Sequence, residues 1–345
     1  MPASAGNALL DHYRATARAL PWRSLPGEPR VDPYRVWLSE VMLQQTTVAT
    51  VIPRFARFLE RWPSVDALAG AADEDVLHEW AGLGYYARAR NLIACARVVA
   101  AAGGFPDTEA GLRALPGIGD YTAAAIAAIA FGRDSVAVDT NVERVVARLG
   151  AISDKAAVRD SAAKLVPTGH AGDFAQAMMD LGATICRPRK PDCGACPISS
   201  HCKALAIGTP EAFPVKAPRK VRPVRYGTAQ WIERDGAVWL VRRPSKGLLG
   251  GMPALPGSEW NTHPLNLQHN RLPYKAAIIP YKAAELAQVR HLFTHFELHL
   301  SVVASARVHG EGWWQPIETL DDIGLPSLYR RAVDAVLAQR KSLAA

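Results

Sequence analysis

Apolar positions follow a helical period through the first part of the chain and change toward period two after about residue 226. From Asn7 to Thr108 the pattern is helical, apart from a loop rich in proline and glycine that ends at Pro33. Residues 34–45 predict a largely apolar helix, and residues 120–131 predict an alanine-rich one. Residues 226–242 predict a strand–turn–strand with an Asp-Gly turn, residues 291–307 a second β-rich stretch, and residues 332–339 a closing helix.

A change of composition separates the two patterns. Residues 209–225 carry four prolines, five basic residues and one acid. Such a segment is typical of an extended basic linker that lies along DNA, and a solvated tether without contacts is the alternative. The sequence therefore predicts a multidomain α + α/β protein with boundaries at 1–208, 209–225 and 226–345.

Length and charge agree with two domains and an anionic partner. A chain of 345 residues is too long to be comfortable as one domain, and its net charge is +8. It has no run of 18 apolar residues, and its first residues have no basic flank followed by an apolar core. We expect a cytoplasmic protein.

A glycine-rich turn, Leu115-Pro116-Gly117-Ile118-Gly119, precedes the alanine-rich helix. Glycine allows positive φ and close backbone approach, and the free amide groups at a helix N-terminus favour a phosphate. An ordinary helix–turn–helix connection is the other interpretation.

Glu40 is the one acid within the apolar helix 34–45. Its neighbours three and four residues away include Val36, Trp37 and Leu43, so we expect its carboxyl to be desolvated and its pKa to be raised. A carboxyl that is protonated near neutral pH suits a general acid. A glutamate on the solvated face of the helix is the alternative.

Asp139 stands before a second predicted helix, in Val138-Asp139-Thr140-Asn141-Val142-Glu143-Arg144-Val145. Thr140 with Glu143 three residues later has the pattern of a capping box, which explains Thr140 better than it explains Asp139. An anion here suits a developing positive charge.

Four of the five cysteines are bunched in a C-x6-C-x2-C-x5-C pattern at Cys186, Cys193, Cys196 and Cys202. This bunching favours a metal or cluster over disulfides. Zinc is the runner-up, although paired CxxC units are its usual pattern. Basic residues lie in and beside this loop, namely Arg187, Arg189, Lys190 and Lys203. The fifth cysteine, Cys95, fits a buried apolar site.

These motifs together resemble the MutY family of adenine DNA glycosylases, which belongs to the helix-hairpin-helix endonuclease III superfamily. The resemblance rests on S-E-V-M-L-Q-Q-T, on W-x-G-L-G-Y-Y-x-R-x-R-N-L, on the glycine turn, on V-D-x-N-V-x-R-V and on the 6-2-5 cysteine spacing. It covers about residues 21–202, and Thr140 departs from it where glycine is expected. It implies an all-α glycosylase domain with a structural [4Fe-4S] cluster on the four cysteines.

The resemblance also implies the chemistry and the partner. Glu40 protonates adenine N7 and later activates water, while Asp139 stabilises the sugar cation; Asn141 and Tyr121 complete the catalytic set. The substrate is double-stranded DNA with adenine opposite 8-oxoguanine or guanine, bound by a monomer. The implied contacts to DNA and the lesion are Arg23, Leu43, Gln45, Thr46, Tyr85, Gly117, Gly119, Phe293, Thr294 and His295.

Tyr121 separates two relatives, because endonuclease III-type enzymes place a Schiff-base lysine at this point. We therefore expect a monofunctional glycosylase. A bifunctional glycosylase/lyase and a non-catalytic iron–sulfur DNA-binding protein are the alternatives.

The C-terminal part resembles a Nudix fold around residues 247–257. Between Pro244 and Arg290 the only acids are Glu259 and Glu285, whereas a Mg²⁺-dependent pyrophosphohydrolase needs several carboxylates. We expect a binding domain, in which the resemblance assigns Phe293-Thr294-His295 to 8-oxoguanine recognition. His291, His295 and His299 have the spacing of a helical metal face, but alternation along a strand is the favoured interpretation.

Overall fold

The computed structural model describes residues 4–215, 221–244, 247–263, 284–308 and 310–344. The chain forms two compact units, residues 1–71 with 91–218 and residues 72–90 with 219–345. This division groups residues 72–90 with the C-terminal part. The boundaries expected from the sequence therefore stay a prediction.

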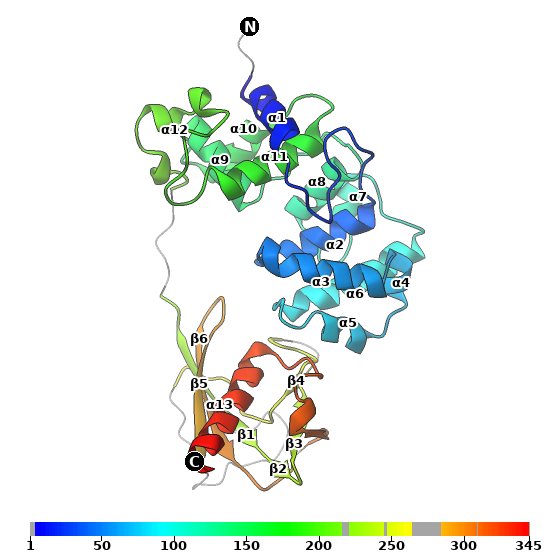
Figure 1. The fold of residues 1–345 in the computed structure, drawn as a ribbon, viewed down its shortest axis with the longest axis vertical. Coiled ribbons are helices and arrows are strands. Elements are labelled where there is room, and N and C mark those ends of the chain that lie inside the picture. The colour runs from blue at the N-terminus through cyan, green and yellow to red at the C-terminus, as the bar shows by residue number, and fades with distance from the viewer. Residues whose placement is uncertain (1–3, 216–220, 245–246, 264–283, 309, 345) are drawn as a thin grey trace. The chain divides into compact units, whose positions relative to one another are not determined.

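The described part of the first unit is helical (Figure 1). Its helices are α1 (Ala5–Thr16), α2 (Pro33–Leu43), α3 (Val48–Arg61), α4 (Val65–Ala69), most of α6 (Tyr86–Ala101), α7 (Glu109–Arg113), α8 (Asp120–Ile129), α9 (Thr140–Gly150), α10 (Lys155–Ala163), α11 (Ala171–Thr184) and α12 (Lys203–Ala206), with 3-10 turns at Ser199–His201 and Pro210–Ala212. The second unit adds α5 (Asp73–Glu79), the first turn of α6, and α13 (Ser327–Ala344).

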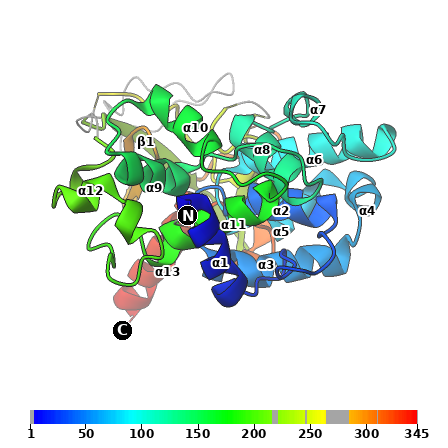
Figure 2. The same cartoon turned by 90° about the horizontal axis from the view of Figure 1, so that it is seen from above.

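Helix α8 lies at the centre of the helical unit. Residues 123–128 of this helix are fully buried, and α2 and α11 pack against it. Small side chains allow this close approach, since a Cβ on Gly172 of α11 would lie 2.6 Å from the carbonyl oxygen of Ala128. Helix α1 lies beside α11 (Figure 2). The short side chains of α8 thus let α2 and α11, which carry polar side chains, pack against the same helix.

Helix α2 begins with Asp32, whose side chain accepts a hydrogen bond from the backbone of Tyr34, and with Pro33. It ends at Leu43, so the helix expected over residues 34–45 was too long by two residues. Gln45 has φ +57°, a left-handed backbone that ends the helical path. The side chain of Gln45 therefore leaves the helix at a turn.

The described residues of the second unit form two sheets. The strands are β1 (Val224–Trp231), β2 (Glu233–Arg234), β3 (Ala237–Arg242), β4 (Pro253–Ala254), β5 (Glu285–Leu292), β6 (Glu297–Ala304) and β7 (Trp313–Pro316). One sheet has the order β1-β6-β5, with β1 parallel and β5 antiparallel to β6. In the other sheet, β3 pairs with each of β2, β4 and β7. Helix α13 packs against β5 (Figure 1). This mixture of sheet and helix is the α/β architecture expected from the change of period.

The Asp-Gly turn closes a shorter hairpin than the sequence suggested. Asp235 and Gly236 have φ of +50° and +74°, as a two-residue hairpin turn requires, and they join β2 to β3. The long strand β1 pairs with β6 and not with β3. The predicted strand–turn–strand is therefore divided, because Ile232 separates β1 from β2 and it is β2 that pairs with β3 across the turn.

The three histidines at four-residue spacing lie on a β-hairpin. His291 is in β5, His299 is in β6, and His295 lies in the turn between these strands. Neither a helical face nor one strand is correct, because the chain reverses between Leu292 and Glu297. Of the predicted linker, residues 216–220 lie outside the described residues; Pro210–Ala212 form a 3-10 turn, and β1 begins at Val224.

In the part of the chain that the structure describes, no helix is both long and apolar enough to span a membrane.

Candidate active site

Glu40 and Asp139 line the same cavity, which has a volume of about 740 Å³ in the first unit. Glu40 comes from α2 and Asp139 from the N-terminus of α9. The cavity is also lined by other residues that the sequence singled out, namely Arg23, Leu43, Gln45, Thr46, Tyr121 and Asn141. The two carboxyl groups thus face a common space with the size of a ligand site.

Glu40 is buried, with 7% of its surface exposed, and does not lie on the solvated face of its helix. Burial raises the pKa of this carboxyl to about 7, and the negative charge of Asp139 adds to the rise. A hydrogen bond from Tyr121 and the charge of Arg23 oppose it. Near neutral pH, Glu40 is therefore populated both with and without its proton, which suits a group that first donates and later accepts one.

Asp139 is held in place by its own helix. It is the N-cap of α9: one carboxylate oxygen accepts a hydrogen bond of 2.7 Å from the backbone of Val142, and the other accepts one of 3.0 Å from the amide of Asn141. The capping box of Thr140 and Glu143 was therefore wrong, since Asp139 makes the capping bond and Glu143 pairs with Lys155 at 3.1 Å. The same side chain therefore caps α9 and lines the cavity.

Asn141 is oriented in turn by Arg144, which is buried on the next turn of α9. Arg144 donates 2.8 Å from Asn141 Oδ1, 2.7 Å from the carbonyl oxygen of Gly182 and 2.8 Å from that of Cys186. Gly182 is required for this approach, since a Cβ there would lie 2.6 Å from Asn141 Cβ. A chain of hydrogen bonds therefore connects the Asp139 carboxylate to the backbone of the first cysteine of the loop.

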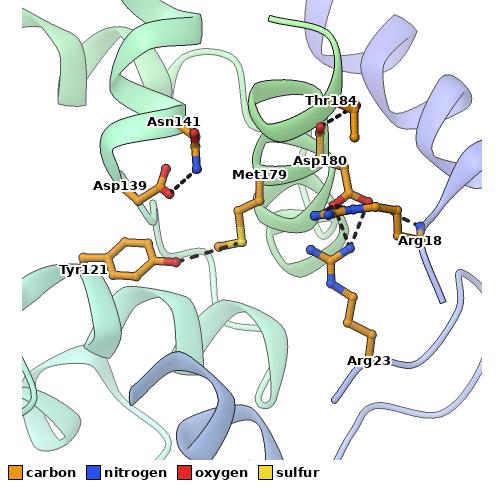
Figure 3. A network of polar contacts seen from close by, with 8 residues as sticks. All are labelled: Arg18, Arg23, Tyr121, Asp139, Asn141, Met179, Asp180 and Thr184. Atoms are coloured by element: carbon orange, nitrogen blue, oxygen red, sulfur yellow. Dashed lines mark hydrogen bonds and ion pairs between the residues drawn. The ribbon is translucent and has the colours of Figure 1, made fainter. Parts of the chain in front are cut away.

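Tyr121 lies on α8, and its hydroxyl points toward Met179 near Asp139 (Figure 3). Its hydroxyl is 3.9 Å from the sulfur of Met179 and also forms a hydrogen bond with Glu40. We assign the proton to Glu40, because a carboxylate is a much stronger acceptor than a thioether. Burial, followed by the charges of both acids, raises the pKa of Tyr121 well above 10, so the phenol stays a neutral donor.

The structure adds residues that the sequence reasoning missed. Arg23 and Arg18 converge on Asp180 of α11, with Arg23 Nη1 2.8 Å and Arg18 Nε 2.7 Å from its oxygens (Figure 3). Gln176, one turn before Asp180, is buried, and its side-chain oxygen has no hydrogen-bond partner among the described residues. Arg18 and Gln176 also line the cavity. A polar residue in an apolar helix, the signal that identified Glu40, would have identified both Gln176 and Asp180.

The glycine turn leaves amide groups open at the start of α8. Gly119 is the N-cap and no side chain accepts from the first turn. Gly117 has φ +74°, and a Cβ on it would lie 2.6 Å from Asn91, whereas Gly119 has φ −91° and no atom near its Cβ position. Only Gly117 uses the conformational freedom of glycine. Gly119 leaves an open surface over which an anion can approach the amide groups.

The four cysteines line a small apolar cavity of about 30 Å³ with Arg148. Arg148 Nη1 lies 3.3 Å from Cys186 Sγ and also donates to the carbonyl oxygen of Arg187 at 2.7 Å. Within the described residues, no three His, Cys, Asp or Glu side chains converge as ligands of one metal ion. Four thiols arranged around a cavity, with a buried guanidinium beside one of them, fit a cluster of several iron atoms.

The predicted lesion contacts lie in the second unit. Tyr85 is half exposed, and its hydroxyl is 2.9 Å from the hydroxyl of Thr294. Thr294 and His295 are exposed at the tip of the β5–β6 hairpin, whereas Phe293 stacks on Trp260 with ring centroids 5.4 Å apart. Phe293 therefore anchors the hairpin tip, and Thr294 and His295 are the side chains presented to a partner.

Comparisons with known proteins agree with both halves of the chain. Residues 38–168 match the profile of the HhH-GPD superfamily of base excision DNA repair proteins, residues 186–202 match the iron–sulfur binding domain of endonuclease III, and residues 228–335 match the NUDIX domain. Adenine DNA glycosylase of Mus musculus is 37% identical in an alignment of 359 positions, which covers 86% of this chain and 70% of the mouse protein.

The chain belongs to the adenine DNA glycosylase family. The protein of that name from Mycolicibacterium smegmatis is 44% identical over 209 residues, covering 59% of this chain and 70% of the relative. A solved thermostable thymine-DNA glycosylase superposes with a TM-score of 0.53 at 30% identity, covering 59% of this chain and 95% of that structure. The chain is thus a base excision repair glycosylase, a hydrolase of N-glycosyl bonds, with a [4Fe-4S] cluster as its cofactor.

Proposed function

We propose that this chain is a monofunctional glycosylase that removes adenine mispaired with 8-oxoguanine or guanine in double-stranded DNA. The observation that carries the proposal is the pair of carboxyl groups, Glu40 and Asp139, on one cavity. Cleavage of an N-glycosidic bond passes through an oxocarbenium-like state, which requires a proton at the leaving base and an anion beside the sugar.

Glu40 is the proton donor to adenine N7. Its pKa of about 7 leaves a substantial protonated fraction at neutral pH, and Tyr121 holds the carboxyl in place. Once the proton has left, the carboxylate accepts a proton from the water that attacks the sugar. Asp139 stabilises the positive charge of the sugar with a carboxylate that two hydrogen bonds hold in a fixed orientation.

The remaining walls of the cavity suit an adenine base. The unpartnered side-chain oxygen of Gln176 is an acceptor for the exocyclic amine, and the Asp180 carboxylate fixes the guanidinium of Arg23 near Glu40. A purine swung out of its duplex fits a cavity of this size. Guanine carries a carbonyl where adenine carries the amine, so Gln176 would meet a second acceptor and select against it.

The absence of strand cleavage follows from the side chains around the cavity. Tyr121 occupies the position where the related lyases have a lysine. Lys155 is the one lysine among the described residues that line the cavity. Its side chain is 82% exposed and forms an ion pair with Glu143. A nucleophilic lysine needs a desolvated site, which Lys155 lacks.

DNA is contacted by several surfaces in this proposal. The open amide groups after Gly117 and Gly119 bind a phosphate, Gln45 and Tyr85 fill the vacated stack, and Thr294 with His295 reads the base opposite adenine. Arg23 and Asn141 support the two acids, and Leu43 and Thr46 border the cavity. The protein acts as a monomer on the bacterial nucleoid in the cytoplasm.

Duplexes with adenine opposite 8-oxoguanine, guanine and thymine test the proposal directly. The first two should release adenine and show strand breaks only after alkali, and thymine should protect adenine. Glu40→Gln should lower base release by roughly 10²–10⁴-fold while duplex binding persists. Breaks before alkali would favour the bifunctional lyase, and full activity of the Gln variant would remove Glu40 from the chemistry.

A further inference from the structure

The loop between α5 and α6, residues 80–85, has a backbone that few residues adopt. Gly82 and Gly84 have φ of +90° and +69°, and Tyr85 follows with φ +49°. A left-handed backbone is unfavourable for an aromatic residue, and it persists only where the surroundings hold it. Tyr85 is nevertheless 49% exposed, so the usual packing of a core tyrosine is not what holds it.

A buried cation lies behind this loop. Arg88, on the first turn of α6, is 9% exposed, and its Nη2 donates to the carbonyl oxygen of Leu83 at 3.1 Å. Its guanidinium carbon is 5.2 Å from the ring centroid of Trp80 and 5.6 Å from that of Tyr85. One cation therefore contacts the rings at both ends of the loop and a carbonyl between them.

Two further hydrogen bonds close the same loop. Trp80 is fully buried, and its indole N–H donates to the carbonyl oxygen of Gly84 at 2.9 Å. The backbone N–H of Arg88 donates to the carbonyl oxygen of Tyr85 at 2.7 Å. Trp80 is thus a fixed platform, and Arg88 joins the exposed Tyr85 ring to it.

Arg88 keeps its charge although burial of the guanidinium is unfavourable. Burial lowers the pKa of Arg88 to about 10, which still leaves the guanidinium charged at neutral pH. An apolar side chain of the same length would fill this volume without that desolvation. What the cation adds is attraction to the face of an aromatic ring together with donors of fixed direction.

We propose that Arg88 is a positioning residue, which holds the Tyr85 ring in the orientation from which it enters the DNA stack. This inference deepens the proposed function and rests on the role of Tyr85 given there. A ring that is ordered before binding loses less conformational freedom when it stacks between bases. Arg88 would therefore strengthen binding without touching DNA.

The first test needs no DNA. A fluorinated tyrosine placed at position 85 of the full chain reports the ring by ¹⁹F NMR in four backgrounds: unchanged, R88M, R88K and R97M. Arg97 is an exposed arginine of the same helix, so R97M is the matched control. We expect R88M to shift and broaden the resonance, R88K to restore part of it, and R97M to leave it unchanged. An unchanged resonance in R88M would overturn the proposal.

The second test measures insertion. Each variant is bound to a duplex with 2-aminopurine beside the base opposite adenine, and Y85A sets the signal expected without a wedge. We expect R88M to lose most of the fluorescence change and to weaken binding by about 3- to 30-fold, from the range of cation–π energies. The single-turnover rate at saturating enzyme should fall less than affinity does.

The two tests separate the possible failures. If Y85A inserts and binds like the unchanged protein, the wedge role assigned to Tyr85 is wrong, and with it the purpose proposed for Arg88. If Y85A loses the signal but R88M keeps it, Arg88 is a structural residue only and the proposed function stands. A lowered melting temperature of R88M with normal fluorescence would have the same meaning.

Discussion

The polar side chains of two regions differ in burial and in hydrogen bonding. One region is the cavity of the first unit, and the other is the hairpin tip at residues 293–295 of the second unit. In the cavity, Glu40 is buried and the Asp139 carboxylate accepts two hydrogen bonds. At the tip, Thr294 and His295 are exposed, and Thr294 has one hydroxyl partner. Chemistry needs charges whose environment is set before the substrate arrives, whereas recognition uses groups that find their partners in the complex.

This comparison predicts that small changes in the cavity have large effects and that changes at the tip have small ones. The largest effects should be on the rate of base release, the next largest on stability, and the smallest on the discrimination between mispairs.

The charge of Asp139 should have a large effect on base release, comparable with that of Glu40→Gln. Asp139→Asn retains a good N-cap for α9 but removes the anion beside the sugar. We expect base release to fall by about 10²–10³-fold, with stability changed by less than about 1 kcal/mol. Single-turnover kinetics and thermal melting measure the two quantities. A rate close to that of the unchanged protein would show that Asp139 is only a capping residue.

Glu40 should destabilise the fold at alkaline pH. Its folded pKa of about 7 lies above its ordinary value of 4.5, so the unfolded chain releases this proton first as pH rises. Stability is therefore lost between pH 4.5 and 7, by on the order of 3 kcal/mol for this group alone. Glu40→Gln should stabilise the protein at pH 8 and leave it nearly unchanged at pH 4, as denaturant titrations at both values would show. Equal effects at the two pH values would contradict a buried, protonated Glu40.

Arg144 links the Asn141 side chain of the cavity to the backbone of the cysteine loop through hydrogen bonds. Arg144→Met removes the hydrogen bond that fixes Asn141, so Asp139 loses one oriented donor. We expect base release to fall by about 10- to 100-fold, the range for hydrogen bonds to charged groups. Asn141→Ala should reproduce this loss, and the double variant should lose no more than either change alone. Loss of iron, followed by absorbance near 400 nm, would instead show that Arg144 acts on the cysteine loop.

The sequence predicted the parts of the cavity whose chemistry is unusual for their position. Glu40 stood out as an acid in an apolar helix, and the cysteines stood out by spacing. Asp180 and Arg144 were missed because their partners, Arg23 and Cys186, are 157 and 42 residues away. Only folding brings such pairs together, so no local pattern indicates the pairing, although Asp180 does stand out as a polar residue in an apolar helix. The position of Gln45 was missed for a local reason: nothing in Leu43-Gln44-Gln45 signals that α2 ends there.

The strand pairing of the second unit was harder to predict because its strands pair with strands that are distant in the sequence. The Asp-Gly turn was correct, but the partner of β1 is β6, about 70 residues further along. The α/β class followed from the period, whereas strand order depends on contacts that the period does not encode. The role of the tip came from family resemblance, since exposed residues such as Thr294 and His295 carry no burial signal.

Thr294 should have the smallest effect and therefore tests the other side of the comparison. Thr294→Val keeps the shape of the side chain and removes the hydroxyl that lies 2.9 Å from Tyr85, whereas Thr294→Ser keeps the hydroxyl and removes a methyl group. Because one exposed hydrogen bond contributes about 0.5–1.5 kcal/mol, Val should reduce the preference for 8-oxoguanine over guanine by about 2- to 12-fold, with Ser within twofold of the unchanged protein. Competition binding with the two mispairs, at equal salt, measures this preference. A loss as large as that of Asp139→Asn would mean that the tip is as rigidly organised as the cavity, and the contrast between the two regions would then be wrong.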